Sequence, residues 1–169
     1  LPTLGDVFSN MNQAEQLILK AIQQGAEWII LPEMFTSAVA FHDSMLKAIQ
    51  PLDGPPLQLL KKLAYKNNVV IGGSFLAARS QQVFNTFVLV FPDGTMFQHD
   101  KDMPTYWENC YYQGGNDDGV LSTPIGPVGS VLCWELIRSQ TARRLFNKVN
   151  MVVSGSCWWT LPDDADPDS

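Results

Sequence analysis

Short apolar runs with the character of β-strands alternate along this chain with stretches of helical periodicity. The apolar runs lie at 28–32, 69–71, 86–91, 95–99, 128–132 and 151–153. Between them, apolar residues recur at the three- and four-residue spacing of a helix face, over 9–24, 56–66 and 139–148. Alternating strands and helices are typical of a sheet whose faces are covered by helices. The sequence therefore predicts the α/β fold class.

Local signals mark the ends of several of these elements. Ser9 or Asn10 can cap the first helix, and Gly25 can end it in a left-handed conformation. The Pro92-Asp93-Gly94 turn between two apolar runs predicts a hairpin. The Gly72-Gly73 pair that follows a strand predicts a place where two backbones approach closely.

The length and composition of the chain describe one globular domain. A chain of 169 residues, 46% hydrophobic and 17% charged, can bury roughly two-thirds of its unfolded surface. No internal repeat or linker is visible, so residues 1–169 are predicted to form a single domain. The net charge of −6 disfavours a nucleic-acid partner, which needs a clustered basic surface. No stretch reaches the roughly 20 apolar residues of a membrane span, so no membrane association is expected.

The cysteines and histidines are too few and too scattered for a disulfide framework or a metal cluster. Cys110, Cys133 and Cys157 have neither the even number nor the regular spacing of a disulfide scaffold. Because His42 and His99 are the only histidines and no zinc-binding pattern occurs, we expect no metal and no cofactor. Free thiols suit a reducing compartment, and a cytoplasmic location is the prediction that follows.

Three residues with reactive side chains each follow an apolar strand-like run. Glu33 follows the run 28–32, Lys101 comes just after 95–99, and Cys133 follows 128–132. In open α/β sheets the ligand crevice lies outside the carboxyl ends of the strands, so these side chains are predicted to share one pocket. A thiol, a carboxylate and an ammonium supply a nucleophile, a proton shuttle and an oxyanion stabiliser. Together they indicate acyl-transfer chemistry without a histidine.

Each of the three residues also has a simpler interpretation. A lone cysteine is more often a packing residue, a lone lysine is a solvated cation, and Glu33 could be a first-turn helix carboxylate. Cys133, however, lies between a strand and a helix, where the helix dipole would lower the pKa of its thiol and favour the thiolate. The apolar neighbours Met34 and Phe35 predict a partly desolvated Glu33 with a raised pKa.

Two common hydrolase designs are disfavoured. The chain has no G-x-S-x-G elbow of the α/β serine hydrolases. A papain-like site needs a histidine to activate Cys133. His42 lies in a polar segment and His99 lies on a strand beside Lys101, and neither occupies a recognisable position for that role.

The segments around these three residues resemble the Glu, Lys and Cys motifs of the nitrilase superfamily of carbon–nitrogen hydrolases. They are GAEWIILPEMF (25–35), DKDMPTYWE (100–108) and GSVLCWE (129–135), in the family's order and approximate spacing. Asn85-Thr86 before an apolar strand is a further shared feature, and the similarity runs from about Thr3 to Trp159. The resemblance implies an αββα sandwich, with two mixed sheets packed together and helices outside. Measured against that plan the chain is expected to be an incomplete copy, which lacks the family's first strand and its C-terminal strands.

The resemblance also implies roles for the three residues. Cys133 would be the nucleophile, and Glu33 would be the general base and acid. Lys101, helped by a backbone N–H near Trp134, would stabilise the tetrahedral oxyanion.

Further residues are supporting candidates. The family often has a second glutamate at the position of Glu108, in contact with the lysine and the substrate, and Glu135 is expected to orient the nucleophile loop. Arg138 could bind a substrate carboxylate or face solvent, whereas Cys110 and Cys157 are interpreted as packing residues. Aromatic side chains could wall the pocket: Trp134, Tyr106, Trp107, Trp158 and Trp159.

Nitriles and amides need the same catalytic equipment, so the preferred substrate rests on finer motif resemblance. Cys133-Trp134-Glu135 and Lys101-x-x-Pro104-Thr105-x-x-Glu108 resemble the true nitrilase branch, whereas Glu108-x-x-Tyr111-Tyr112-x-Gly114 also resembles carbamoyl-amide hydrolases. We predict that a cysteine thioester forms on a small nitrile or amide, releasing ammonia and a carboxylic acid, with nitriles preferred. An amidase or N-carbamoyl-amide hydrolase is the alternative, and a non-catalytic scaffold is a second one. The resemblance further implies a homo-oligomer.

Overall fold

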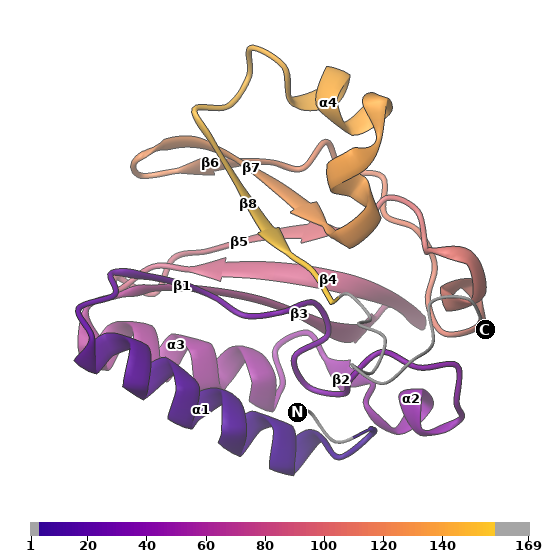
Figure 1. Ribbon diagram of the computed structural model, residues 1–169, viewed down its shortest axis with the longest axis horizontal. Helices are drawn as coiled ribbons and strands as arrows, with labels where there is room; N and C mark the ends of the chain where they lie inside the picture. Colours follow the sequence, from indigo (N-terminus) through magenta and orange to yellow (C-terminus); the bar gives the residue numbers. More distant parts are fainter. Residues whose placement is uncertain (1–3, 158–169) are drawn as a thin grey trace, which may run out of the picture.

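Two mixed β-sheets stack face to face, and helices cover their outer sides (Figure 1). The structure, a computed structural model, describes residues 4–157. The first sheet has the strand order β1-β3-β4-β5, with β2 pairing beside β3 further along that strand. Its strands are β1 (Trp28–Ile30), β2 (Gln50–Pro51), β3 (Val70–Arg79), β4 (Gln82–Val90) and β5 (Met96–Asp100). β1 and β2 run parallel to β3, whereas β3, β4 and β5 are antiparallel neighbours.

The second sheet is smaller and also mixed. Its strands are β6 (Val120–Thr123), β7 (Gly126–Leu132) and β8 (Met151–Gly155). β6 is antiparallel to β7, and β8 is parallel to it.

The helices form the outer layers. The long helices α1 (Val7–Gln23) and α3 (Pro55–Asn67) lie against the first sheet, and α4 (Ser139–Leu145) lies beyond the second sheet (Figure 1). The remaining helices are short: α2 (Ser44–Lys47) and the 3₁₀-helices η1 (Tyr106–Cys110) and η2 (Cys133–Ile137). The order of layers is therefore helix, sheet, sheet, helix, and the predicted αββα architecture is confirmed.

The side chains of β4 alternate between two hydrophobic cores. Val88 and Val90 belong to the core between the first sheet and its helices. Phe87 and Leu89 belong to the core between the two sheets, together with Leu132 of β7. Because successive residues of a strand face opposite sides, a sheet buried on both faces requires an uninterrupted apolar run like this one.

Two expected features of the first helix have different outcomes. Helix α1 begins at Val7, and its cap is the Asp6 side chain, which accepts a hydrogen bond from the Ser9 N–H at 3.0 Å. Ser9 and Asn10 therefore lie within the helix, and Asn10 Nδ2 instead donates to the Thr36 carbonyl at 3.0 Å. The left-handed conformation predicted for Gly25 is confirmed by its φ of +86°.

The glycine pair of β3 accommodates side chains and not a second backbone, so that prediction is wrong. A Cβ on Gly72 would lie 2.6 Å from the Phe87 ring, and a Cβ on Gly73 would lie 3.0 Å from the Phe35 ring. β3 also continues far beyond the predicted 69–71, to Arg79, where a tight turn leads directly into β4. The sequence prediction also missed the short elements α2, β2 and β6.

Candidate active site

Glu33 lies in the turn that follows β1, and hydrogen bonds fasten this turn to β3. The Leu31 N–H donates to the Gly72 carbonyl at 2.8 Å. On the other side of Glu33, the Met34 N–H donates to Ser74 Oγ at 2.9 Å. Glu33 is only 2% exposed. The turn therefore holds a carboxylate in the interior.

Lys101 follows the last residue of β5 and is fully buried. Its N–H donates to the Asn85 carbonyl at 3.0 Å, and its carbonyl accepts from the Gly115 N–H at 2.8 Å. A Cβ on Gly115 would lie 2.4 Å from Asp100 Cβ, so only glycine allows this loop to approach so closely. The main chain of Lys101 is thus held from two sides.

Cys133 begins η2 directly after β7, with a left-handed φ of +50°. A residue with a β-carbon rarely adopts this conformation, and the strain is typical of functional sites. Cys133 is buried at this sharp change from strand to 3₁₀-helix, and Glu33 and Lys101 are buried as well.

The structure brings these three side chains together. Lys101 Nζ lies 2.9 Å from Glu33 Oε1, and the Cys133 thiol hydrogen-bonds to the Glu33 side chain. Asn85 Nδ2 donates to the same Glu33 oxygen at 2.8 Å. Glu33 is therefore the common neighbour of the thiol and the ammonium.

Glu108 joins the cluster from η1. Its Oε2 lies 2.7 Å from Lys101 Nζ and accepts hydrogen bonds from the Tyr112 hydroxyl at 2.5 Å and the Thr105 N–H at 2.6 Å. Burial and the charge of Glu108 raise the pKa of Tyr112, so this hydroxyl stays protonated as a donor. Glu108 thus makes the lysine contact that the resemblance implies.

One ammonium faces two buried carboxylates in this cluster. Burial raises the pKa of Glu33 and the charge of Glu108 adds to this, although Lys101 acts in the opposite direction. For Lys101, burial alone would lower the pKa, but the charges of Glu33 and Glu108 outweigh it and raise the pKa. The site therefore combines a lysine whose ammonium form is favoured with a carboxylate that binds protons more readily than usual.

The expected lowering of the thiol pKa is wrong. Burial and the neighbouring charge of Glu33 raise the pKa of Cys133 to about 11. η2 is a 3₁₀-helix of 5 residues, so it lacks the aligned peptides that give a long helix its dipole. Cys133 is therefore a protonated thiol near neutral pH, and a base would be needed to ionise it.

A cavity of about 270 Å³ opens onto the cluster. It is lined by Glu33, Val39, Thr105, Trp107, Glu108, Cys133, Trp134 and Cys157. Two carboxylates, two thiols and two aromatic side chains thus line one space of small-molecule size.

The aromatic candidates divide into three groups. Trp107 and Trp134 line the cavity, as expected of pocket walls. Tyr106 is 89% exposed and is not among the described lining residues. Trp158 and Trp159 lie outside the described residues.

Three other sequence interpretations need correction. Cys110 is exposed and is not a packing residue, and Cys157 is half-buried and lines the cavity. Arg138 was expected to bind a substrate carboxylate or to face solvent. Its Nη1 instead donates to Asp102 Oδ1 at 2.6 Å.

Glu135 is fully buried, two residues after Cys133. Its carboxylate accepts hydrogen bonds from the Leu132 N–H at 2.6 Å and the Asp102 N–H at 2.9 Å. These amides belong to the residue before Cys133 and the residue after Lys101. Although burial acts to raise it, the hydrogen bonds of Glu135 with His99 and with these amides lower its pKa to about 2.

Sequence reasoning missed the contributions of Asn85, His99 and Asp117. Asn85 was visible only as part of a shared motif, and its contact with Glu33 joins residues 52 positions apart. His99 was considered only as a base for Cys133, yet it is buried between Asp117 and Glu135. The one available signal was that His99 lies on β5 two residues before Lys101, a spacing that places two side chains on the same face of an extended chain.

Within residues 4–157, no group of three His, Cys, Asp or Glu side chains is arranged to hold a metal ion. None of the described helices is long and apolar enough to cross a membrane.

A family model and the sequences of known proteins indicate the same family. Residues 2–158 match the family model described as carbon-nitrogen hydrolase. Nitrilase 3 of Arabidopsis thaliana is 30% identical over 154 residues, which cover 77% of this chain and 44% of the relative. N-carbamoylputrescine amidase of the same plant is 28% identical over 151 residues, which cover 83% of this chain and 50% of the relative. The chain thus spans about half the length of these curated relatives.

Solved structures share the fold at low sequence identity. A carbon-nitrogen hydrolase from Helicobacter pylori superposes with a TM-score of 0.84 at 17% identity, covering 98% of this chain and 60% of that one. A mutant of the amidase from Nesterenkonia sp. AN1 superposes with a TM-score of 0.74 at 15% identity, covering 92% of this chain and 63% of that one.

Proposed function

Because the chain belongs to the carbon–nitrogen hydrolase family, we propose that it is a thiol hydrolase that cleaves non-peptide carbon–nitrogen bonds of small nitriles or amides. One observation carries the proposal. Glu33, which lines the cavity together with Cys133, contacts both the Lys101 ammonium and the Cys133 thiol. A carboxylate shared in this way can move a proton from the nucleophile while the ammonium stays charged.

The first half of the reaction follows from this geometry. Glu33, as a carboxylate, accepts the thiol proton of Cys133, and the sulfur attacks the electrophilic carbon of the substrate. In an amide, the carbonyl π electrons move onto oxygen, and the Lys101 ammonium offsets the negative charge. The protonated Glu33 then donates to the departing nitrogen, ammonia leaves, and a thioester remains on Cys133. A nitrile first gives a thioimidate, which adds water and loses ammonia to reach the same thioester.

The second half returns the enzyme to its starting state. Glu33, again a carboxylate, takes a proton from water, and the hydroxide attacks the thioester carbon. The tetrahedral intermediate collapses, the carbon–sulfur bond breaks, and Glu33 returns the proton to sulfur as the carboxylic acid forms. Glu108 holds the lysine in place throughout, since its own carboxylate is fixed by Tyr112 and Thr105.

Nitriles are the substrates that we prefer in this proposal. The Cys133-Trp134-Glu135 sequence has the character of the nitrilase branch, and Nitrilase 3 is among the relatives at 30% identity. An N-carbamoyl amide is the alternative, because N-carbamoylputrescine amidase is similar at 28% identity. The cytoplasmic location and the homo-oligomer stay predictions.

Ammonia release from matched nitrile, amide and N-carbamoyl substrates tests the proposal. We expect release by the wild type, loss of release in Cys133→Ala, and full release in Cys110→Ala, which changes an exposed thiol. Turnover of the amide alone would show that the nitrile preference is wrong. A folded wild type that releases no ammonia from any substrate would favour the scaffold, and a Cys133→Ala variant with full activity would exclude the mechanism.

A further inference from the structure

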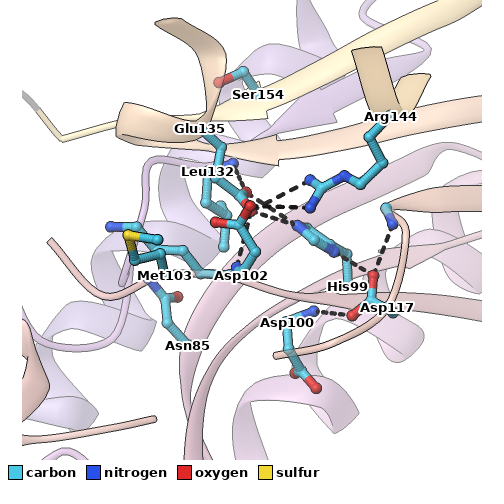
Figure 2. A network of polar contacts seen from close by, with 12 residues as sticks. Asn85, His99, Asp100, Asp102, Met103, Asp117, Leu132, Glu135, Arg144 and Ser154 are labelled. Carbon is cyan, nitrogen blue, oxygen red and sulfur yellow. Dashed lines mark hydrogen bonds and ion pairs between the residues drawn. The ribbon is translucent and has the colours of Figure 1, made fainter. Parts of the chain in front are cut away.

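A second network of charges, with a buried centre, lies next to the candidate active site, and Figure 2 shows His99 between the carboxylates of Asp117 and Glu135. His99 Nδ1 lies 2.5 Å from Asp117 Oδ1, and His99 Nε2 lies 3.0 Å from Glu135 Oε2. The side chains of His99 and Glu135 are fully buried. The network joins β5 of the first sheet to η2, which follows β7 of the second sheet.

The geometry of this network requires a charged imidazole. A neutral imidazole has one donor and one acceptor, and here both ring nitrogens face carboxylate oxygens, which only accept. Burial alone would lower the pKa of His99, but the hydrogen bonds with Asp117 and Glu135 outweigh it and raise the pKa to about 9. From α4, Arg144 adds a positive charge 3.5 Å from Glu135, and it also pairs with Asp102 at 3.0 Å. The network is thus close to balanced in charge.

The two carboxylates of this network hold the main chain on both sides of Lys101. Asp117 Oδ2 accepts from the Asp100 N–H at 2.9 Å, and Glu135 Oε1 accepts from the Asp102 N–H at 2.9 Å. Glu135 Oε2 also accepts from the N–H of Leu132, the residue before Cys133, at 2.6 Å. A single set of side chains therefore fixes the backbone next to both the ammonium and the thiol.

We propose that Asp117, His99 and Glu135 form a positioning unit that sets the separation between the Lys101 ammonium and the Cys133 thiol. The proposal rests on the proposed hydrolase function, because that chemistry makes the separation matter. None of the three belongs to the described lining of the cavity, so they act through Lys101 and Cys133 and not on the substrate. Since the lysine comes from one sheet and the cysteine from the other, their spacing needs a tie across the sheets.

Three isosteric variants test the unit: His99→Gln, Glu135→Gln and Asp117→Asn. Each amide replacement of a carboxylate turns a donor toward a backbone N–H that needs an acceptor. A displacement of about 1 Å between reacting groups costs on the order of 100-fold in rate. We therefore expect kcat for ammonia release to fall by about that factor in Glu135→Gln, with KM little changed. Asp118→Asn is the matched control, because Asp118 is exposed and pairs with Lys148 at 3.6 Å, away from His99.

A second measurement does not depend on the substrate. Iodoacetamide labelling of Cys133, followed by peptide mass spectrometry with the exposed Cys110 as internal reference, reports how well Glu33 activates the thiol. We expect the ratio of Cys133 to Cys110 labelling to fall in His99→Gln and Glu135→Gln and to stay at the wild-type value in Asp118→Asn. If the wild type releases no ammonia and these ratios still change, the hydrolase proposal fails while the positioning unit stands.

Other outcomes would overturn the unit. Variants that melt at a lower temperature but keep the wild-type kcat and labelling ratio would show a purely structural network. Equal effects of Asp117→Asn and Asp118→Asn on kcat and on the labelling ratio would also contradict the positioning unit. Asp117→Asn keeps the test decisive if a buried variant does not fold, because the Asp117 side chain is 39% exposed. In a double-mutant cycle, His99→Gln and Glu135→Gln should together cost less in kcat than the product of their separate effects.

Discussion

At the scale of a single residue, Glu33 determines the charge balance of the proposed active site. Its carboxylate accepts from Lys101 and Asn85 and contacts the thiol of Cys133. Because Lys101 is shared with Glu108, the ammonium cannot fully offset both carboxylates. The surplus of negative charge in a buried place is what keeps a proton within reach of Glu33.

Replacement of Glu33 by glutamine is expected to abolish proton transfer without disturbing the fold. The glutamine oxygen can still accept from Lys101 and Asn85, but it cannot take the thiol proton. Loss of a general base typically lowers rates by about 10²- to 10⁴-fold, and we expect Glu33→Gln to lose ammonia release within that range. Glu15→Gln, which changes a residue 3.8 Å from the exposed Lys62, is the control and should keep full activity. A Glu33→Gln enzyme with near wild-type initial rates would assign the base to another residue.

The pH dependence of kcat/KM gives a second prediction for the same residue. Glu33 must be ionised to accept the proton, so activity should fall as the pH is lowered through its pKa. Burial raises that pKa above the ordinary 4.5, so the acidic limb should lie above pH 4.5. The thiol, with a pKa of about 11, does not ionise by itself in the neutral range. Initial rates across the pH range measure this, and an acidic limb at or below 4.5 would contradict the desolvated Glu33.

At the scale of elements, the sequence predicted the apolar strands well and the loop contacts poorly. The runs 86–91 and 128–132 correspond to β4 and β7 because an uninterrupted apolar run suits a strand buried on both faces. β3 was underestimated, since glycine, serine and alanine fill most of the stretch from Gly72 to Ala78 and give no strong strand pattern. The contact of His99 with Asp117 could not be foreseen, because it depends on how the loop beyond Gly115 folds back onto β5.

His99 should make the free energy of unfolding decrease at alkaline pH. The folded protein raises the pKa of His99 from 6.5 to about 9, so its contribution is complete below pH 6.5 and is lost as pH rises through 9. The shift corresponds to a loss on the order of 3 kcal/mol in the free energy of unfolding. The groups around His99 are Asp117, Glu135 and, through Glu135, Arg144.

Urea unfolding below pH 6.5 and above pH 9 measures this loss. His99→Gln should remove most of the difference between the two conditions, because glutamine carries no charge at either. His42→Gln replaces an exposed histidine and should keep the wild-type difference. The same decrease in His99→Gln as in the wild type would mean that other groups cause it.

At the scale of the whole molecule, the candidate site lies where the two sheets meet. Glu33 and Lys101 follow β1 and β5 of the first sheet, whereas Cys133 follows β7 of the second. Strand ends in the sequence were enough to predict that the three side chains converge. They did not predict two sheets, because hydrophobic periodicity does not state which strands pair, and the αββα arrangement came from family resemblance. The core between the sheets therefore determines how far Lys101 lies from Cys133, whereas the core under the helices contacts only the first sheet.

A matched pair of core variants separates the effect of core packing on stability from its effect on the spacing of the two sheets. Leu89 belongs to the core between the sheets and Leu60 to the core under the helices, and both are fully buried. Each Leu→Ala change should lower the free energy of unfolding by about 2 to 5 kcal/mol. Only Leu89→Ala should also reduce kcat at temperatures where both variants are folded, because it lets the sheet that carries Lys101 shift against the sheet that carries Cys133. Urea unfolding and ammonia release measured on the same samples test this, and an equal loss of kcat in the two variants would mean that the spacing of the sheets does not control the site.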